Sequence, residues 1–428
     1  MTLAVGLLHY TAPPVVGGVE AILGAHARML AGSGHHVRVI TGRGGPLPTP
    51  IETVRVPLLD ARSPRIRAVR AELDAGRVPP AFEDLVATLT GELERSLAGL
   101  DVLVAHNVCT MPLDLPATVA LRRLVEDGTA PPLVAWTHDL ASAAGPLGRG
   151  LHPGRPWDAL TTAWPSTRMV AISDARRGEL AAALGVPLAT IAVVPNGIDR
   201  ASFLGLHPAT RRLVAGLALD GAGPVLLTPA RITPRKNLEL AIAVVARLRD
   251  GGNDARLIVT GAPDPHDPST LAYLDGLRAI AASSAPGAVH FVGTEPRGGA
   301  SPRVTADLYR VADALLLPSR DEGFGLPLIE AAVCRLPVIC ADLPALREVA
   351  GREATYIDPD GDPGEIAALI RERLATDRSH RLSSRVRRRF DWSAIYERQI
   401  EPLLLDVAAT GRAATAAIPT AGSHQAVG

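Results

Sequence analysis

The residues of this 428-residue chain best suited to chemistry lie around one lysine. Lys236 is the only lysine, so the other 43 of the 44 lysine and arginine side chains are arginines. It follows Arg231 in "ARITPRKN". A planar guanidinium and a compact ammonium could together neutralise a departing diphosphate group without a metal. Chance retention in an arginine-biased chain and a Schiff base to pyridoxal phosphate are the alternative explanations for Lys236.

A second group lies in "DEGFGLPLIE", where Glu322 and Glu330 stand eight residues apart at the start of an expected helix. Carboxylates accept hydrogen bonds from hydroxyl groups, so one glutamate could hold a sugar ring and the other a ribose. The backbone of Gly323, Phe324 and Gly325 could bind sugar oxygens. The simpler alternative is that both acids only favour a helix N-terminus.

A third group lies in the first half of the chain. Gly17 and Gly18 of "GGVE" precede a helix, and glycines there let backbone N–H groups approach an anion. His138, followed by Asp139, ends the apolar run "PLVAWTHD". A histidine beside an acid suggests acid–base work or sugar binding, with a structural role as the alternative.

The sequence gives the least information about which residues would bind the acceptor of a transferred group. His9, His106 and Asn107 end other apolar runs, and Arg155 lies in a Gly/Pro-rich loop after His138. We expect these four residues to line an acceptor pocket, with simple packing as the alternative for the first three. His35 and His36 lie where a strand is about to start, and both are expected at the surface.

These residues need a scaffold that gathers distant parts of the chain at one edge. Short apolar runs alternate with helical stretches, which is typical of parallel sheets covered on both faces. We predict an α/β fold of two tandem Rossmann-like doubly wound domains facing across a cleft. The strands are expected at 3–9, 36–42, 101–107, 132–139, 169–173, 224–230, 255–262, 288–293, 314–319 and 337–342, and the apolar run at the start of "IAVVPNGID", 191–199, closes the first half.

The pattern also predicts the limits of the domains. Residues 1–200 form the first domain and 201–388 the second, with a break in periodicity at "PNGIDRASFLGLHP". A further helix covers 389–408, and the Ala/Gly/Thr-rich segment 409–428 is expected to be a disordered tail. Residues 61–98 are expected to be helical, and their arginines either face solvent or contact an acidic acceptor or an anionic membrane.

The motifs resemble those of the retaining glycosyltransferases of family 4, which have the GT-B fold. "DEGFGLPLIE" is similar to the family's E-x7-E signature, "ARITPRKN" to its R-x4-K element, "GGVE" to its glycine pair and "WTHD" to its His-Asp. "VPNGID" resembles its interdomain link, and the C-terminal helix with "FDW" resembles the segment that crosses back to the first domain. The resemblance covers nearly the whole chain.

The resemblance implies a role for each motif residue. Arg231 and Lys236 would bind the donor diphosphate, Glu330 the ribose and Glu322 a hydroxyl of the donor sugar. Gly18 would approach the phosphates or the sugar, and His138 would face the reacting carbon. The full set of implied donor-site residues is Gly17, Gly18, Arg231, Lys236, Gly323, Phe324, Gly325, Leu326 and Glu330, with His138, Glu322, Arg231 and Lys236 as the catalytic set.

The expected activity is therefore transfer of a hexose-type sugar from a nucleoside diphosphate, most simply UDP or GDP, to a small hydroxyl acceptor. No metal is expected, because "DPD" at 358–360 fits a turn. A net charge of zero and 3% aromatic residues argue against nucleic-acid binding. Without a signal peptide or a membrane-length apolar run, the chain is expected in the cytoplasm. A lipid-directed peripheral enzyme and a non-catalytic nucleotide-sugar-binding protein are the alternatives.

Overall fold

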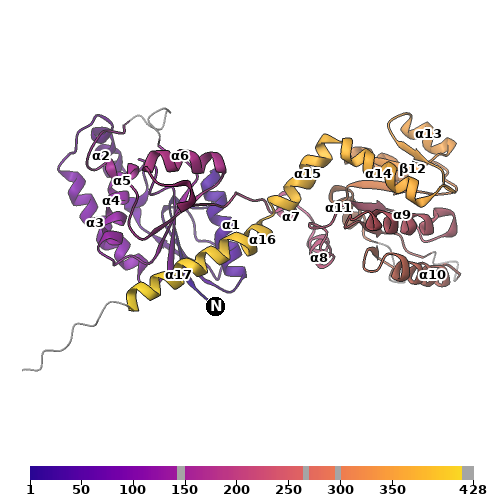
Figure 1. Cartoon of the computed structure of the whole chain (residues 1–428), viewed down its shortest axis with the longest axis horizontal. Helices are drawn as coiled ribbons and strands as arrows, with labels where there is room; N and C mark the ends of the chain where they lie inside the picture. The colour runs from indigo at the N-terminus through magenta and orange to yellow at the C-terminus, as the bar shows by residue number, and fades with distance from the viewer. Residues whose placement is uncertain (142–149, 264–268, 295–299, 417–428) are drawn as a thin grey trace, which may run out of the picture. The chain divides into compact units, whose positions relative to one another are not determined.

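The computed structural model describes residues 1–428 except 142–149, 264–268, 295–299 and 417–428. The chain forms two compact units (Figure 1): unit 1 is Met1–Gly197 together with the chain from Trp392 onward, and unit 2 is Ile198–Asp391. The chain therefore passes from unit 1 to unit 2 after Gly197, three residues before the expected limit at 200. Unit 2 extends three residues beyond 388.

Unit 1 is built on a seven-stranded sheet in the order β3-β2-β1-β4-β5-β6-β7, with every pair parallel. Its strands are β1 Ala4–Thr11, β2 His36–Arg43, β3 Glu52–Arg55, β4 Val102–His106, β5 Leu133–Thr137, β6 Thr167–Ala171 and β7 Ile191–Val193. Its helices are α1 Gly18–Gly32, α2 Pro64–Asp74, α3 Ala81–Leu97, α4 Leu115–Glu126, α5 Asp158–Thr161, α6 Asp174–Leu184, α16 Trp392–Ile395 and α17 Glu401–Ala416, with short turns η1 Pro57–Leu59, η3 Leu188–Thr190 and η5 Tyr396–Ile400.

Alternation along β1 shows why this sheet is covered on both faces. Leu8 and Tyr10 enter the core under α2, α3 and α4, whereas Val5 and Leu7 enter the core under α1 and the C-terminal helices. All four side chains are buried. A strand that is apolar on both faces reads as a continuous apolar run, which is why the sequence predicts it well.

The C-terminal helical segment from Trp392 completes unit 1. Its buried side chains share a core with β1, β4 and β5, and α17 packs near β4 and β5 (Figure 1). Helix α17 continues to Ala416, so the segment expected to be disordered from 409 is helical for its first eight residues. The rest of that expected tail, 417–428, lies outside the described residues.

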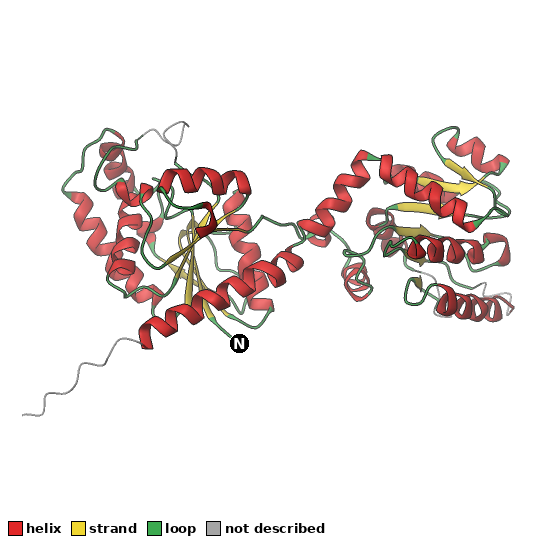
Figure 2. Ribbon diagram, in the orientation of Figure 1, coloured by secondary structure: helices red, strands yellow, loops and turns green. Residues whose placement is uncertain are grey.

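Unit 2 repeats the architecture of a sheet covered by helices (Figure 2). Its six parallel strands follow the order β10-β9-β8-β11-β12-β13. Its strands are β8 Val225–Thr228, β9 Arg256–Val259, β10 Val289–Phe291, β11 Ala314–Leu317, β12 Val338–Ala341 and β13 Thr355–Ile357. Its helices are α7 Arg200–Phe203, α8 Pro208–Gly216, α9 Leu238–Asp250, α10 Ser269–Ser284, α11 Pro302–Val311, α12 Leu326–Val333, α13 Pro344–Ala350, α14 Pro363–Thr376 and α15 Arg378–Arg389, with the turn η4 Pro234–Lys236. The two sheets confirm the predicted doubly wound α/β class.

The arginine-rich segment after β3 forms α2 and α3. Ser63 caps α2 by accepting a hydrogen bond from the Ile66 backbone, and Pro64 fits the first helical turn, where no N–H is needed. The apolar side chains of α2 are buried, namely Ile66, Val69 and Leu73. Three of its neighbouring cations are exposed, namely Arg62, Arg65 and Arg67. Helix α2 thus presents charge outward and keeps its apolar face in the core.

Candidate active site

Both sheets place the predicted residues at the point where the strand order reverses. In unit 1 this point lies between β1 and β4, and in unit 2 between β8 and β11. Connections leave such neighbouring strands toward opposite faces of the sheet, which opens a crevice at their carboxyl ends. His9 and His106 lie at the first of these points, and Lys236 and Glu322 follow the strands of the second.

The centre of the unit 2 site is an ion pair between Lys236 and Glu322. The Lys236 Nζ donates to the Glu322 Oε1 across 2.6 Å, and the Ser319 hydroxyl donates to the same oxygen across 2.7 Å. The side chains of Lys236 and Glu322 are only 10% and 8% exposed. An ammonium carries three donors, so two remain for a ligand. The structure brings these two predicted residues together.

Asn237 fixes the backbone that carries Lys236. It adopts a left-handed conformation with φ 54°, which asparagine tolerates better than most residues. Its Nδ2 donates to the carbonyl oxygens of Pro318 and Pro359 at 3.1 and 2.7 Å. The Arg320 backbone N–H donates to the Arg235 carbonyl at 2.8 Å. The loop after β8 is therefore tied directly to the loop after β11.

The loop between Glu322 and α12 needs a glycine at its last position. Gly325 has φ +93°, and a Cβ there would lie 2.5 Å from the Leu346 side chain. Gly323 and Phe324 are exposed just before the helix, as is Leu326 at its start. The free N–H groups of a helix N-terminus suit an anion or a sugar oxygen.

Glu330 and Arg231 are both exposed side chains of unit 2. Glu330, on α12, is exposed and accepts a hydrogen bond from the Tyr309 hydroxyl of α11. Arg231 follows β8 and is exposed to solvent. Both side chains are accessible to a ligand of unit 2.

Unit 1 gathers histidines from three neighbouring strands. His9 Nδ1 donates to the His106 carbonyl at 2.8 Å, because a carbonyl oxygen can only accept. His106 Nδ1 lies 3.0 Å from His138 Nε2, and the two rings stack with centroids 5.3 Å apart. His138 is 5% exposed, whereas His106 has no exposed surface. The expectation that His106 lines an acceptor pocket is therefore wrong, because His106 lies behind His138.

Asn107 is also occupied by the protein. Its Oδ1 accepts from the backbone N–H groups of His138 and Asp139 at 2.8 and 3.0 Å, and its Nδ2 donates to Asp139 Oδ2 at 3.1 Å. Only 4% of its surface is exposed. This corrects the expectation of an acceptor contact, because the Asn107 amide already binds the turn that carries His138.

Burial keeps these histidines neutral. Desolvation and the nearby His9 lower the pKa of His138 to about 4, although Asp139 opposes the shift. Burial and His138 lower the pKa of His26, on α1, to about 3. Desolvation also lowers the pKa of His9 and that of His106. A charged ring in this cluster would lose its hydration without gaining an acidic partner of comparable strength.

The two glycines before and at the start of α1 have different surroundings. A Cβ on Gly17 would lie 2.0 Å from the Glu20 carboxylate, which also accepts from the Thr11 hydroxyl. A Cβ on Gly18 would meet nothing within 4 Å. Gly18, at the N-terminus of α1, is therefore open to an approaching ligand.

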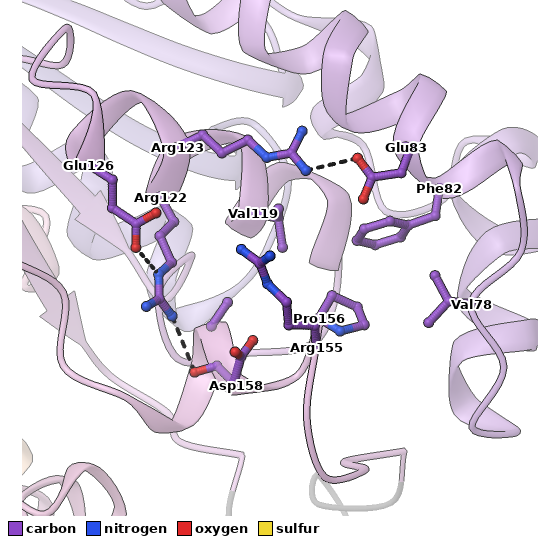
Figure 3. Close-up of a pocket in the computed structure, with 11 residues that line it drawn as sticks. Val78, Phe82, Glu83, Val119, Arg122, Arg123, Glu126, Arg155, Pro156 and Asp158 are labelled. Carbon is purple, nitrogen blue, oxygen red and sulfur yellow. Dashed lines mark hydrogen bonds and ion pairs between the residues drawn. The ribbon is translucent and has the colours of Figure 1, made fainter.

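Arg155 lies in a different pocket, shown in Figure 3. Its guanidinium lies beside Val119, between Arg122 and Arg123, and Phe82 also lines this pocket. Arg122 is held by Glu126 and Arg123 by Glu83, at 2.7 and 2.8 Å. The histidines of the β1 and β4 edge are not among the lining residues, so the structure does not bring Arg155 together with them.

Comparisons with known proteins identify the family. Residues 16–202 match the model of Glycosyltransferase Family 4, and residues 211–389 match that of Glycosyl transferases group 1. A D-inositol 3-phosphate glycosyltransferase of Frankia alni is 32% identical over 369 residues, 80% of this chain and 84% of that protein. The chain belongs to the family 4 glycosyltransferases.

The chain is also similar to two other glycosyltransferases. A D-inositol 3-phosphate glycosyltransferase of Kineococcus radiotolerans is 32% identical over 258 residues, and the match covers 55% of this glycosyltransferase and 56% of that protein. The crystal structure of WaaG, a glycosyltransferase involved in lipopolysaccharide biosynthesis, aligns with 95% of this chain and 99% of that chain, at 19% identity and a TM-score of 0.35.

Sequence reasoning missed several residues of the glycosyltransferase site. Ser319 and Tyr309 hold the two signature glutamates, and His26 packs against His106 with ring centroids 5.3 Å apart. Ser319 ends the apolar run of β11, so its position after a strand was a usable signal. Tyr309 and His26 lie within helices, where nothing in the local pattern separates them from ordinary core residues.

The buried histidines predict that this glycosyltransferase loses stability in acid. The unfolded rings protonate near pH 6.5 but the folded ones do not, so the unfolded state binds more protons as pH falls from about 6.5 to 4. Each of His26 and His138 should cost about 2 kcal/mol of unfolding free energy between pH 7 and pH 5. Asp114, whose pKa burial raises to about 7, opposes this by a similar amount.

A variant isolates the effect from Asp114. His26→Leu keeps an apolar side chain at a site that is 2% exposed. Urea unfolding at pH 7 and pH 5 should show a loss about 2 kcal/mol smaller in the variant than in the parent chain. An equal loss in both proteins would show that His26 does not become protonated on unfolding in this range.

Proposed function

We propose that this glycosyltransferase moves a hexose-type sugar from a nucleoside diphosphate to a hydroxyl group of a small polyol phosphate, with retention of configuration. The bond from the anomeric carbon to the diphosphate breaks, and a bond from that carbon to the acceptor oxygen forms on the same face. The acceptor proton passes to an oxygen of the leaving phosphate. No separate protein base is needed in this scheme.

The observation that carries the proposal is the buried contact of Lys236 with Glu322. It places a fixed cation beside a carboxylate at the entrance of α12, where backbone N–H groups also converge. Charge on a leaving diphosphate would meet the ammonium, and Glu322 would accept a hydrogen bond from the sugar. Glu330, exposed on the same helix, would bind the ribose. The acceptor class is suggested by the relatives, which are named D-inositol 3-phosphate glycosyltransferases.

A panel of UDP-, GDP- and ADP-sugars tests the proposal. A bound donor at 100 times its dissociation constant should raise the unfolding free energy by about 2.7 kcal/mol, visible as a higher melting temperature. The stabilising donor should then release its nucleoside diphosphate with an inositol phosphate as acceptor, and proton NMR should show an anomeric configuration equal to that of the donor. Binding without turnover toward any polyol phosphate or sugar would favour the non-catalytic alternative.

Activity should survive metal removal. In the described part of the chain, no group of three or more His, Cys, Asp or Glu side chains is placed to hold a metal ion. The "DPD" segment forms a turn in which the Asp360 backbone N–H donates to Asp358 Oδ1 at 2.9 Å and Asp360 pairs with Arg320 at 2.6 Å. Initial rates in excess EDTA should equal those with added Mg²⁺. A rate restored only by Mg²⁺ would contradict the proposed role of Lys236 as the cation at the diphosphate.

The structure gives little support to the alternative of a peripheral enzyme that acts on a lipid. Within the described residues, no helix is long and apolar enough to cross a membrane. The arginine-rich helix α2 buries its apolar side chains rather than exposing them beside the cations. Co-sedimentation of the protein with anionic lipid vesicles at moderate salt would support this alternative.

A further inference from the structure

His106, the last residue of β4, and Asn107, which follows it, direct polar atoms toward His138. His106 Nδ1 meets the His138 ring at Nε2, 3.0 Å away, and Asn107 Oδ1 accepts from the His138 backbone N–H at 2.8 Å. Strands β4 and β5 are adjacent and parallel, with His106 opposite Trp136. Both residues are buried, so neither offers these atoms to a ligand. Their contacts fix the ring and the backbone of one residue.

Asn107 holds the turn through its unusual backbone as well as its amide. Its φ is +61°, in the left-handed region that asparagine adopts more readily than most residues. This conformation directs its side chain to the turn after β5, where it binds both His138 and Asp139. The Thr110 hydroxyl adds a hydrogen bond to the Asp139 carbonyl at 2.9 Å. The turn is therefore fixed from β4 at four points.

The contact between the two rings constrains where their protons lie. With both imidazoles neutral, one nitrogen of the pair donates and the other accepts. His106 Nε2 is buried and has no hydrogen-bond partner in the described part of the protein. A buried N–H without an acceptor is rarer than a buried acceptor without a donor. His106 therefore carries its proton on Nδ1 and donates to His138 Nε2, which leaves the His138 proton on Nδ1.

We propose that His106 and Asn107 are positioning residues for sugar transfer: His106 fixes the His138 proton on Nδ1, and Asn107 fixes the turn, so that His138 presents an N–H donor to a hydroxyl or phosphate oxygen of the donor. This inference rests on the proposed function, because it takes His138 to contact the donor sugar. His106 and Asn107 act through His138 and do not touch the substrate. The group that His138 would recognise is an oxygen atom that accepts a hydrogen bond.

The groups around His138 are consistent with a ring that stays neutral. His9 faces it from β1, His106 from β4 and His26 from α1, and Asp139 follows it in the turn. Burial and His9 oppose a charge on His138, and Asp139 favours one. A charge on His138 would in turn lower the pKa of His106 and that of His26. Losing the bond from His106 would make protonation of His138 easier, because an Nε2 without a donor can accept a proton. The acid limb of the activity profile would then move to higher pH.

The first test reads the proton directly in the ligand-free full chain. Protein labelled with ring-¹⁵N histidine gives distinct nitrogen shifts for the two neutral tautomers, and the His138 signals are assigned by their loss in His138→Asn. We expect the Nδ1–H tautomer for His138 at pH 7.5, and its loss in His106→Phe. An Nε2–H tautomer in the parent chain would overturn the proposal. This result does not depend on finding the donor or the acceptor.

The second test uses two variants with the donor that the panel selects. His106→Phe keeps the ring volume without the hydrogen bond, whereas His106→Asn can place an amide N–H close to the position of Nδ1. We expect kcat to fall about tenfold or more in the first, with its acid limb at higher pH, and to recover largely in the second. Equal losses in both variants with an unmoved pH profile would show a purely structural role.

A control separates this inference from the proposed function. His106 lies in unit 1, so His106→Phe should keep the melting-temperature shift that a nucleoside diphosphate gives through unit 2. If the parent chain shows neither that shift nor turnover with any donor, the proposed function fails while the tautomer result still stands. If donor turnover is normal and His106→Phe matches the parent chain in kcat and pH profile, the positioning role fails alone.

Discussion

Lys236→Ala should lower kcat by about 10²- to 10³-fold, the usual cost of removing one preorganised group that meets developing charge. The Lys236 ammonium lies 2.6 Å from Glu322, and its side chain is almost fully buried. In such a site an ammonium acts with little solvent screening, and water cannot replace it without losing the fixed geometry. Steady-state release of the nucleoside diphosphate measures the effect.

The same change should also destabilise unit 2. Removing one partner of a buried ion pair costs up to about 3 kcal/mol when the other charge is left without compensation. Here Arg235 Nη1 would still lie 3.9 Å from Glu322 Oε2, so the cost should be smaller than that. Ser319 would still donate to Glu322 and recover part of this loss. In the double variant Lys236→Ala with Glu322→Gln, the second change removes the unpaired charge, so stability should largely return while activity does not. Urea unfolding and kcat together separate the two roles of the lysine.

Two matched variants sharpen the test. Lys236→Arg keeps the positive charge but replaces a compact ammonium by a larger planar group, so part of the donor binding should remain while turnover is lost. Arg247→Ala removes an exposed cation of α9, whose ion pair with Asp250 is open to solvent. That control should change neither quantity measurably. Full turnover in Lys236→Arg would contradict the idea that the shape of this cation matters.

The sequence could predict this site coarsely because its residues follow strands. Apolar runs show where β8 and β11 end, and parallel strands carry ligands at those ends, so Lys236 and Glu322 were expected on one edge. The direct 2.6 Å contact could not be predicted. It depends on the adjacency of β8 and β11 and on the left-handed Asn237, which ties the two loops together. Both are tertiary features without a local pattern.

The errors in unit 1 have a common physical origin. His106 and Asn107 end an apolar strand and look like ligand-facing polar residues, yet their side chains bind a neighbouring strand's turn. His35, expected at the surface, is 5% exposed and accepts from the Leu3 backbone N–H. A polar side chain whose partner is distant in sequence gives no local sign of that partner. The edge strands β3 and β13 were also missed, and β3 has no fully buried side chain that would form an apolar run.

The second large effect is expected from Trp392→Ala, which should destabilise unit 1 by about 3–5 kcal/mol. Trp392 is 7% exposed, and its ring meets His26 edge-on with centroids 5.3 Å apart. A Cβ on Gly197 would lie 2.7 Å from this ring, so the indole packs directly on the backbone at the end of the first segment. The side chain thus joins the C-terminal helical segment to the core of unit 1, and its loss leaves a cavity there.

The location of this effect can be measured because the two units have separate cores. Hydrogen exchange of the full chain in increasing urea, followed by mass spectrometry, should show peptides of β1, β4 and β5 opening at lower urea in Trp392→Ala. Peptides of β8 and β11 should shift less. Arg398→Ala, an exposed change on the same helical segment, is the control and should stay within about 0.5 kcal/mol of the parent chain. If unit 2 opened first in Trp392→Ala, the assignment of the C-terminal helices to unit 1 would be wrong.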